Sequence, residues 1–290
     1  MKLGTRGSAL ALAQARAVAA ALEAAGHEGV EIVAITTSGD RGIRTHPPDK
    51  ARWIDTIEDA LERGEIDLAV HSAKDVPAAA LLRPGFKLAA VLPREDPRDA
   101  LVGAGSLDDL PAGARVGTAS LRRRAQVLAA REDLEVVALR GNVDTRLRKL
   151  AAGECDALVL AAAGLRRLGR AGEIGALLDP AVFVPAPGQG LLAVEGATLP
   201  EAIVDPGGDR ALSYERRVVE ALDATCDTPV GCHFDGAALH AFVGLPDGSA
   251  WLRDRVRVRD GEDPAALLVQ RLRSMGAADL LAQAEAMATA

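Results

Sequence analysis

The chain of 290 residues is short of several residue types, and each shortage excludes a class of protein. Three cysteines, an odd number, provide no disulfide framework and favour a reducing, cytoplasmic setting. No spacing of cysteine and histidine resembles a zinc site, so we expect no metal. The net charge of −7 argues against a general nucleic-acid binder, which needs a basic surface.

Long hydrophobic runs are also missing, and none approaches the roughly 20 residues of a membrane span. The N-terminus faintly resembles a secretion signal, but Arg6 and Arg16 interrupt its alanine and leucine stretch, which predicts an ordinary helix. No glycine-rich phosphate loop of the P-loop or dinucleotide type is present. We therefore expect neither a membrane partner nor a nucleotide of these classes.

Apolar residues make up 49% of the chain, and its length allows two or three domains with proper cores. Over the first two-thirds, β-branched runs alternate with helical patterns, which predicts α/β architecture with a mostly parallel sheet. The expected strands are 2–5, 30–36, 66–70 and 86–92, and the expected helices are 8–25 and 53–63.

Two proline-rich segments divide the chain. Residues 93–99 predict a linker, and residues 184–190 predict a return crossing before a strand at 191–195, so we expect two α/β lobes with a hinge and a cleft. A third, α+β part begins near Asp209, with a helix at 210–222, a hairpin turn at 245–248 and a strand at 256–259. The predicted domains are residues 1–92 with 188–205, residues 98–184 and residues 209–290.

Arginines stand where helices are expected to start. Arg122, Arg123 and Arg124 fall in the first turn of one predicted helix, where the helix dipole makes each cation unfavourable by about 0.3–1 kcal/mol. The segment 139–146 repeats the strand, turn and helix with Arg140 at the turn. A solvated charge run would explain one such cluster, but two of them predict a site for an anion that bears carboxylates or phosphates.

Other residues have a structural and a chemical interpretation. Ser8 is a good helix N-cap, and with Arg6 beside it the same helix end can hold a carboxylate. Asp75 follows a predicted strand, where open α/β sheets bind ligands, and it either caps the next turn or acts as a general acid/base. Cys226 lies among turn residues and is either inert or a nucleophile or attachment point. Cys155 and Cys232 are interpreted as small hydrophobic residues.

Seven stretches, in this order and spacing, resemble the porphobilinogen deaminase (hydroxymethylbilane synthase) family. The stretches are residues 5–11, 71–77, 94–99, 116–123, 139–146, 187–190 and 226–231. The resemblance implies three domains, the first two arranged as in periplasmic binding proteins. It also implies a dipyrromethane cofactor joined to Cys226 by a thioether, in a cytoplasmic monomer. The reaction would join four porphobilinogen molecules head to tail, release ammonia at each step, and yield hydroxymethylbilane for tetrapyrrole and heme biosynthesis.

The resemblance assigns roles to individual residues. Asp75 matches the family's catalytic carboxylate, which stabilises positive charge near the pyrrole nitrogens. The residues that match cofactor contacts are Cys226, Lys74, Ser72, Arg122, Arg123, Thr118, Ser120, Arg140 and Asn142. Those that match substrate contacts are Arg6, Ser8, Arg146, Arg167, Gln189, Lys50 and Trp53.

One segment departs from the family pattern. Residues 43–53 hold no glycine between Ile43 and Trp53, are about three residues shorter than usual, and contain two prolines that stiffen the chain. A non-catalytic pyrrole- or carboxylate-binding protein with a disabled lid is therefore the alternative function. A solute-binding protein is a more distant alternative, and the absence of an export signal argues against it.

Overall fold

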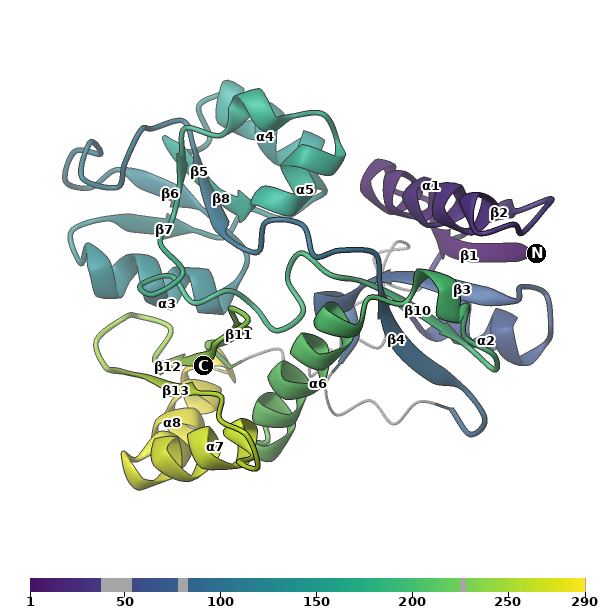
Figure 1. The fold of residues 1–290 in the computed structure, drawn as a ribbon. Coiled ribbons are helices and arrows are strands. Elements are labelled where there is room, and N and C mark those ends of the chain that lie inside the picture. The colour runs from purple at the N-terminus through teal and green to yellow at the C-terminus, as the bar shows by residue number, and fades with distance from the viewer. Residues whose placement is uncertain (38–53, 78–82, 225–227, 290) are drawn as a thin grey trace. The chain divides into compact units, whose positions relative to one another are not determined.

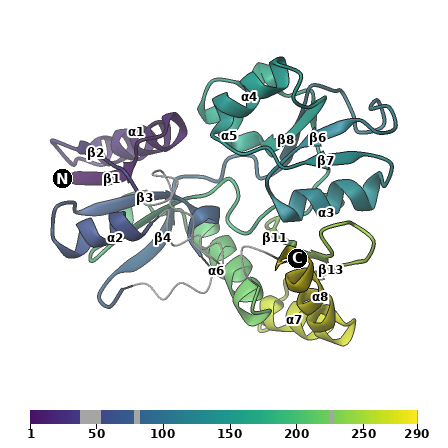
Figure 2. The same ribbon diagram turned by 180° about the vertical axis from the view of Figure 1, so that it is seen from behind.

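The computed structural model describes residues 1–37, 54–77, 83–224 and 228–289, which form two compact units (Figures 1 and 2). Unit 1 comprises Met1–Glu95 and Gly190–Ser213, and unit 2 comprises Asp96–Gln189 and Tyr214–Ala290. Within the described ranges, no helix has both the length and the apolar character needed to cross a membrane.

Unit 1 contains a five-stranded sheet in the order β2-β1-β3-β10-β4. Its helices include α1 (Ala9–Ala24) and α2 (Asp55–Glu62), with a short 3-10 helix η4 (Glu201–Ile203). The strands are β1 (Lys2–Arg6), β2 (Glu31–Ile35), β3 (Leu68–Ser72), β4 (Lys87–Val91) and β10 (Leu192–Gly196).

Side-chain alternation along β3 covers both faces of this sheet. Leu68 and Val70 pack with Val18 and Leu22 of α1, whereas Ala69 packs with Ile57 of α2. Figure 1 shows the two helices on opposite faces of the strands. A strand buried on both sides reads as a continuous apolar run, as Leu68–Ser72 largely does.

The first sheet of unit 2 also has five strands, in the order β7-β6-β8-β5-β9. Helix α3 (Leu121–Ala130) covers one face, and α4 (Val143–Ala151) with α5 (Ala162–Arg167) covers the other. A short 3-10 helix, η3 (Ala171–Glu173), follows α5. The strands are β5 (Asp99–Val102), β6 (Arg115–Gly117), β7 (Glu135–Val137), β8 (Ala157–Ala161) and β9 (Ala176–Leu177).

One strand in each sheet runs against the others. β10 is antiparallel to both of its neighbours, while β1 is parallel to β2 and β3. In unit 2, β5 is antiparallel to β8 and β9, while β6 is parallel to β7 and β8. Each reversed strand is the first one after the chain passes into its unit, and the mostly parallel sheet predicted from the sequence is otherwise confirmed.

A three-stranded antiparallel sheet, β11-β12-β13, completes unit 2. It consists of β11 (Val230–Phe234), β12 (Ala238–Gly244) and β13 (Trp251–Arg257), and it packs on α7 (Pro264–Ser274) and α8 (Ala277–Thr289). Phe242 of β12 is fully buried against Ala125 of α3 and Val184. The chain reaches this sheet through α6 (Pro206–Ala221), which begins in unit 1 and ends in unit 2.

The structure confirms the α/β class and the smaller α+β part, with the hairpin turning between β12 and β13 as expected. Several boundaries differ from the sequence prediction, and the strand expected at 256–259 already begins at Trp251, as β13. The segment 93–99 is shorter as a linker than expected, because Asp99 already begins β5. Helix α6 begins at Pro206, a residue whose fixed backbone suits a first turn, rather than at Arg210. The division into three domains with a hinge and a cleft stays a prediction.

Candidate active site

A pocket of about 50 Å³ in unit 1 brings together predicted site residues from distant parts of the sequence. It lies where β1 and β3, two parallel neighbours, come to their carboxyl ends. Open α/β sheets bind ligands at this edge. The polar residues that line the pocket are Thr5, Arg6, Ser8, Gln14, His71, Ser72 and Asp75.

The turn between β1 and α1 forms one wall of this pocket. Ser8 is the N-cap of α1, and its hydroxyl accepts a hydrogen bond from the backbone N–H of Ala11 at 3.2 Å. The capping interpretation of Ser8 is therefore confirmed, and the same side chain lines the pocket beside half-buried Arg6. A cation at a helix N-terminus makes this wall suitable for an anionic group.

The end of β3 forms the opposite wall. Ser72 exchanges hydrogen bonds with the buried Gln14 amide of α1, with 2.7 Å between Ser72 Oγ and Gln14 Nε2. The Ala73 N–H then donates to the carbonyl of Leu191 at 3.1 Å, and a 3-10 turn, η2 (Ala73–Asp75), follows. This turn places the half-buried Asp75 carboxyl in the pocket lining.

Next to Ser72, the same strand end holds a buried ionisable pair. His71 Nε2 lies 3.3 Å from Glu195 Oε2 of β10, and both side chains are almost fully buried. The strand that delivers Asp75 is thus tied to α1 by Gln14, and its His71 side chain lies beside the buried Glu195. Sequence reasoning missed both residues, although a glutamine inside an alanine-rich helix and a glutamate inside an apolar strand were visible signals.

In unit 2, the predicted arginines surround a buried carboxylate. Asp99 Oδ2 accepts from Arg122 Nη1 at 2.7 Å, and Asp99 Oδ1 accepts from Arg123 Nε at 3.0 Å. Arg122 Nη1 also donates to the carbonyl of Val184 at 2.7 Å, and Arg123 Nη1 to that of Val159 at 3.2 Å. The expected helix start is confirmed, but both arginines are buried rather than exposed to solvent.

Opposite charges allow the Asp99 carboxylate and the two guanidinium groups to be buried together. Burial raises the pKa of the Asp99 carboxyl, but the charges of Arg122 and Arg123 outweigh burial and hold that pKa well below its usual range. Burial lowers the pKa of the Arg122 guanidinium, which Asp99 opposes. An arginine keeps its proton in such a setting, so the cluster consists of two cations and one anion.

The cluster therefore carries one uncompensated positive charge at the N-terminus of α3. The buried Nε of Arg122 has no hydrogen-bond partner within the described ranges. Gln189, predicted as a substrate contact, is also buried here, where its Nε2 donates to Asp99 Oδ1 at 2.9 Å and to the carbonyl of Pro97 at 2.6 Å. A buried positive excess with an unused donor fits an anionic group.

The remaining arginines lie on the helix starts and ends of unit 2. Arg140 is exposed just before α4, and Arg146 Nε donates to the carbonyl of Gly141 at 2.8 Å. Arg167 ends α5 and is half-buried. Asn142 and Ser120, predicted as cofactor contacts, are the N-caps of α4 and α3 and accept from the N–H groups of Thr145 and Arg123 respectively.

Of the remaining predicted site residues, two are described by the structure and three are not. Thr118 is buried, and its hydroxyl accepts from the Ser120 N–H at 3.2 Å. Lys74 is half-buried beside Asp75. Cys226, Lys50 and Trp53 lie outside the described residues.

The two other cysteines behave as predicted. Cys155 and Cys232 are buried thiols, and burial raises the pKa of the Cys155 thiol, which makes it a poor nucleophile. Within the described ranges, no group of three or more potential ligands could hold a metal ion.

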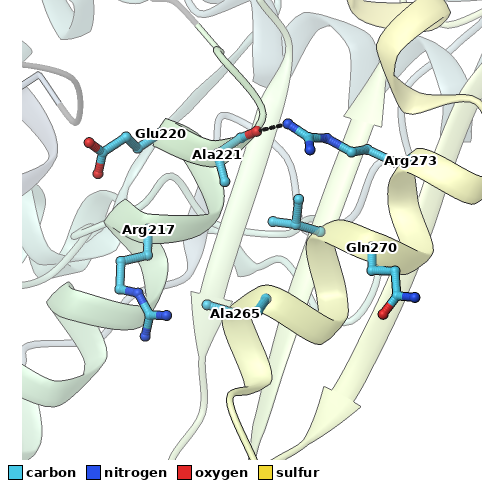
Figure 3. Close-up of a pocket in the computed structure, with 8 residues that line it drawn as sticks. Arg217, Glu220, Ala221, Ala265, Gln270 and Arg273 are labelled. Atoms are coloured by element: carbon cyan, nitrogen blue, oxygen red, sulfur yellow. Dashed lines mark hydrogen bonds between the residues drawn. The ribbon is translucent and has the colours of Figure 1, made fainter.

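A larger groove of about 550 Å³ lies between α6 and α7 in unit 2 (Figure 3). Its floor is apolar, with Ala221, Ala265 and Val269, and Arg273 at its rim donates to the carbonyl of Ala221. Arg217 at the rim is paired with Asp263. None of the predicted site residues lines this groove.

Comparisons with known proteins agree with the sequence resemblance. Residues 1–205 match the family model described as porphobilinogen deaminase, dipyromethane cofactor binding domain. A porphobilinogen deaminase from Rubrobacter xylanophilus is 46% identical over 300 residues, which cover 96% of this chain and 95% of that protein. Another, from Nitrobacter hamburgensis, is 48% identical over 268 residues, which cover 85% and 84%. These relatives give no support to the non-catalytic alternative.

Among solved structures, the methionine-binding protein MetQ is similar with a TM-score of 0.42 and 17% identity. The match covers 68% of this chain and 82% of that chain.

Proposed function

The chain belongs to the porphobilinogen deaminase family, and we propose that Asp75 and the arginines described above carry that family's reaction in this protein. It is a hydroxymethylbilane synthase, a transferase that joins four porphobilinogen molecules head to tail with loss of ammonia. The observation that carries the assignment of residues is the single pocket that gathers Arg6, Ser8, Ser72 and Asp75.

The chemistry of the substrate accounts for the residues in this pocket. Porphobilinogen carries an acetate and a propionate, and loss of its amine leaves an electron-poor, cationic pyrrole. A carboxylate held close to the pyrrole N–H stabilises that charge, and this is the role of Asp75. Arg6, at the N-terminus of α1, binds a substrate carboxylate, and Ser8 adds a hydroxyl at the same helix end.

Asp75 is suited to this role by its placement. The 3-10 turn that bears it is fixed by the Ala73 to Leu191 hydrogen bond, and the preceding Ser72 is fixed by Gln14. A carboxylate held in advance needs no reorganisation when positive charge develops, which is the source of electrostatic catalysis. Gln14 supports the reaction by fixing Ser72 at this strand end.

The residues of unit 2 fit the dipyrromethane cofactor. That group would supply the free pyrrole carbon to which the first unit is joined, and it would bring carboxylates of its own. Arg122 and Arg123 offer one unbalanced positive charge and an unpaired N–H, which suits a carboxylate. Arg140 and Arg146 at the start of α4, with Arg167 at the end of α5, add cations for a chain that gains carboxylates as it grows.

We further propose that Cys226 is the attachment point and that the protein works as a cytoplasmic monomer. A thiolate is a suitable nucleophile for a thioether, and the two other cysteines are buried. Porphobilinogen is then the small-molecule partner, with no nucleic acid or membrane involved.

Intact mass tests the proposal directly. Protein produced in cells that make porphobilinogen should carry a dipyrromethane adduct that is lost in Cys226→Ser and kept in the matched control Cys232→Ser. The Cys226→Ser variant should also release no ammonia from porphobilinogen. An unmodified wild-type thiol, or an adduct that survives in Cys226→Ser, would contradict the assignment.

A further inference from the structure

Asp99 contacts Arg122 and Arg123, the two buried arginines that we propose bind the cofactor. The reaction described so far gives Asp99 no role. Its carboxylate is fully buried and joins Arg122 and Arg123 from its two oxygens. We propose that Asp99 is a positioning residue that fixes the orientation of both guanidinium groups before a carboxylate of the cofactor arrives. The inference rests on the proposed function.

The contacts with Asp99 restrict both arginine side chains. Arg122 approaches Asp99 with both Nη atoms, at 2.7 and 3.3 Å, and Arg123 approaches with Nε at 3.0 Å and Nη2 at 2.8 Å. Such two-point contacts fix the plane of a guanidinium as well as its position. An arginine side chain otherwise has many rotamers, whose loss on binding opposes affinity.

Asp99 is itself held firmly. It begins β5, and its carbonyl accepts from the Leu178 N–H at 2.8 Å. Gln189 Nε2 donates to Asp99 Oδ1 and to the carbonyl of Pro97, so that the amide also fixes the carboxylate. A carboxylate anchored by both its backbone and its side chain can serve as a fixed reference for two longer side chains.

The contacts with Asp99 do not neutralise both arginines. One carboxylate balances one of the two charges, and the Nε of Arg122 remains without a partner within the described ranges. The cluster therefore retains one positive charge for a second carboxylate. Asp99 thus differs from a counter-ion that simply cancels a charge at the binding site.

A merely neutralising role predicts different results from a positioning role. Asp99→Glu keeps the charge and moves the carboxylate by one methylene. Neutralisation predicts normal cofactor loading in this variant, whereas positioning predicts a rate of adduct formation at least tenfold below wild type.

A second test compares Arg123→Gln with the double variant Asp99→Asn/Arg123→Gln. The cluster of Asp99, Arg122 and Arg123 has a net charge of zero in the first variant and of +1 in the second. If charge alone matters, the double variant, with more positive charge, should load the cofactor faster. If positioning matters, Arg123→Gln should load it faster, because Asp99 still orients Arg122.

The experiment starts from protein made without porphobilinogen, then adds porphobilinogen and follows adduct formation by intact mass. Circular dichroism and thermal melting check that each variant is folded. We expect Asp99→Glu to load slowly and Arg123→Gln to load faster than the double variant. Wild-type loading by Asp99→Glu, or loading by the double variant equal to that of Arg123→Gln, would overturn the inference. Failure of the wild type to load would instead overturn the proposed function.

Discussion

Gln14 and Ser72 stand 58 residues apart in the chain, and their side chains meet in a hydrogen bond of 2.7 Å beside the Asp75 pocket. The bond ties α1 to the end of β3, so the helix that carries Ser8 at its start and the strand that leads to Asp75 hold a common geometry. The opposite walls of the site are thereby fixed to each other.

Gln14→Ala should weaken this geometry. The free energy of unfolding should fall by about 1–3 kcal/mol, because the half-buried Ser72 hydroxyl loses its partner and the buried Gln14 side chain is truncated. Since small displacements of catalytic groups lower rates by up to about 100-fold, turnover should fall as well. Urea unfolding and ammonia release measure the two effects. Gln270→Ala, on the exposed face of α7, is the control and should change neither.

Asp75→Asn should lower turnover by about 100-fold or more while the fold is kept, because a neutral amide cannot stabilise the developing cation. Ammonia release at saturating porphobilinogen and a thermal melt provide the measurement. The control is Asp108→Asn, whose carboxyl is 93% exposed and lies 4.0 Å from Arg131. Near-normal turnover in Asp75→Asn would remove Asp75 from its assigned role.

Protein without the cofactor should melt at a lower temperature than protein that carries it. The buried excess of positive charge at Arg122 and Arg123 is unbalanced until a carboxylate binds, and a ligand that binds only the folded state stabilises it. Each kcal/mol corresponds to about 2–4 °C in a protein of 150–250 residues, so a difference of several degrees is expected. Scanning calorimetry of both forms measures the difference in melting temperature. Equal melting temperatures would refute the claim that the cofactor balances the charge of Arg122 and Arg123.

Stability should depend on the ionisation of Asp99 at low pH. The folded pKa of this carboxyl lies below its unfolded value of about 3.9, so its contribution is present above that pH and is lost as the pH falls toward the folded pKa. At pH 7, the free energy of unfolding of Asp99→Asn should be about 3–5 kcal/mol below that of the wild type, because the substitution breaks a buried ion pair. The gap to wild type should narrow below about pH 4 in urea unfolding, and a gap independent of pH would contradict the ion pair.

Gly190→Ala should destabilise the protein more than its backbone strain alone explains. Gly190 has φ +90°, and a β-carbon there would stand 2.2 Å from the Glu95 carbonyl oxygen. Gly26 has nearly the same φ, +94°, but nothing within 4 Å of such a carbon. Gly26→Ala should therefore cost about 1–2 kcal/mol from conformation alone, and the excess in Gly190→Ala measures the close approach. Equal losses in urea unfolding would show that no close approach exists.

Much of the fold could be predicted from local patterns. The β-branched and apolar runs gave four strands of unit 1 within about two residues, and Ser8 was recognised as a helix cap. Local patterns carry no information on distant partners, however. Asp99 reads as one more charge in a polar linker, and only the folded chain brings Arg122 and Arg123 to it. The two arginines at the start of α3 are therefore paired with a carboxylate 23 and 24 residues away in the sequence.

The reversed strand β10 constrains the order in which the chain can fold during synthesis. β3 and β4 are not hydrogen-bonded to each other, because β10 stands between them and pairs with both. The sheet of unit 1 therefore stays divided until residues 192–196 have left the ribosome, after all of residues 96–189. The five-stranded sheet of unit 2 lies wholly within residues 99–177 and can close first. Unit 1, whose strands β1 to β4 are translated first, is thus completed second, and these apolar strands wait longest for their full sheet.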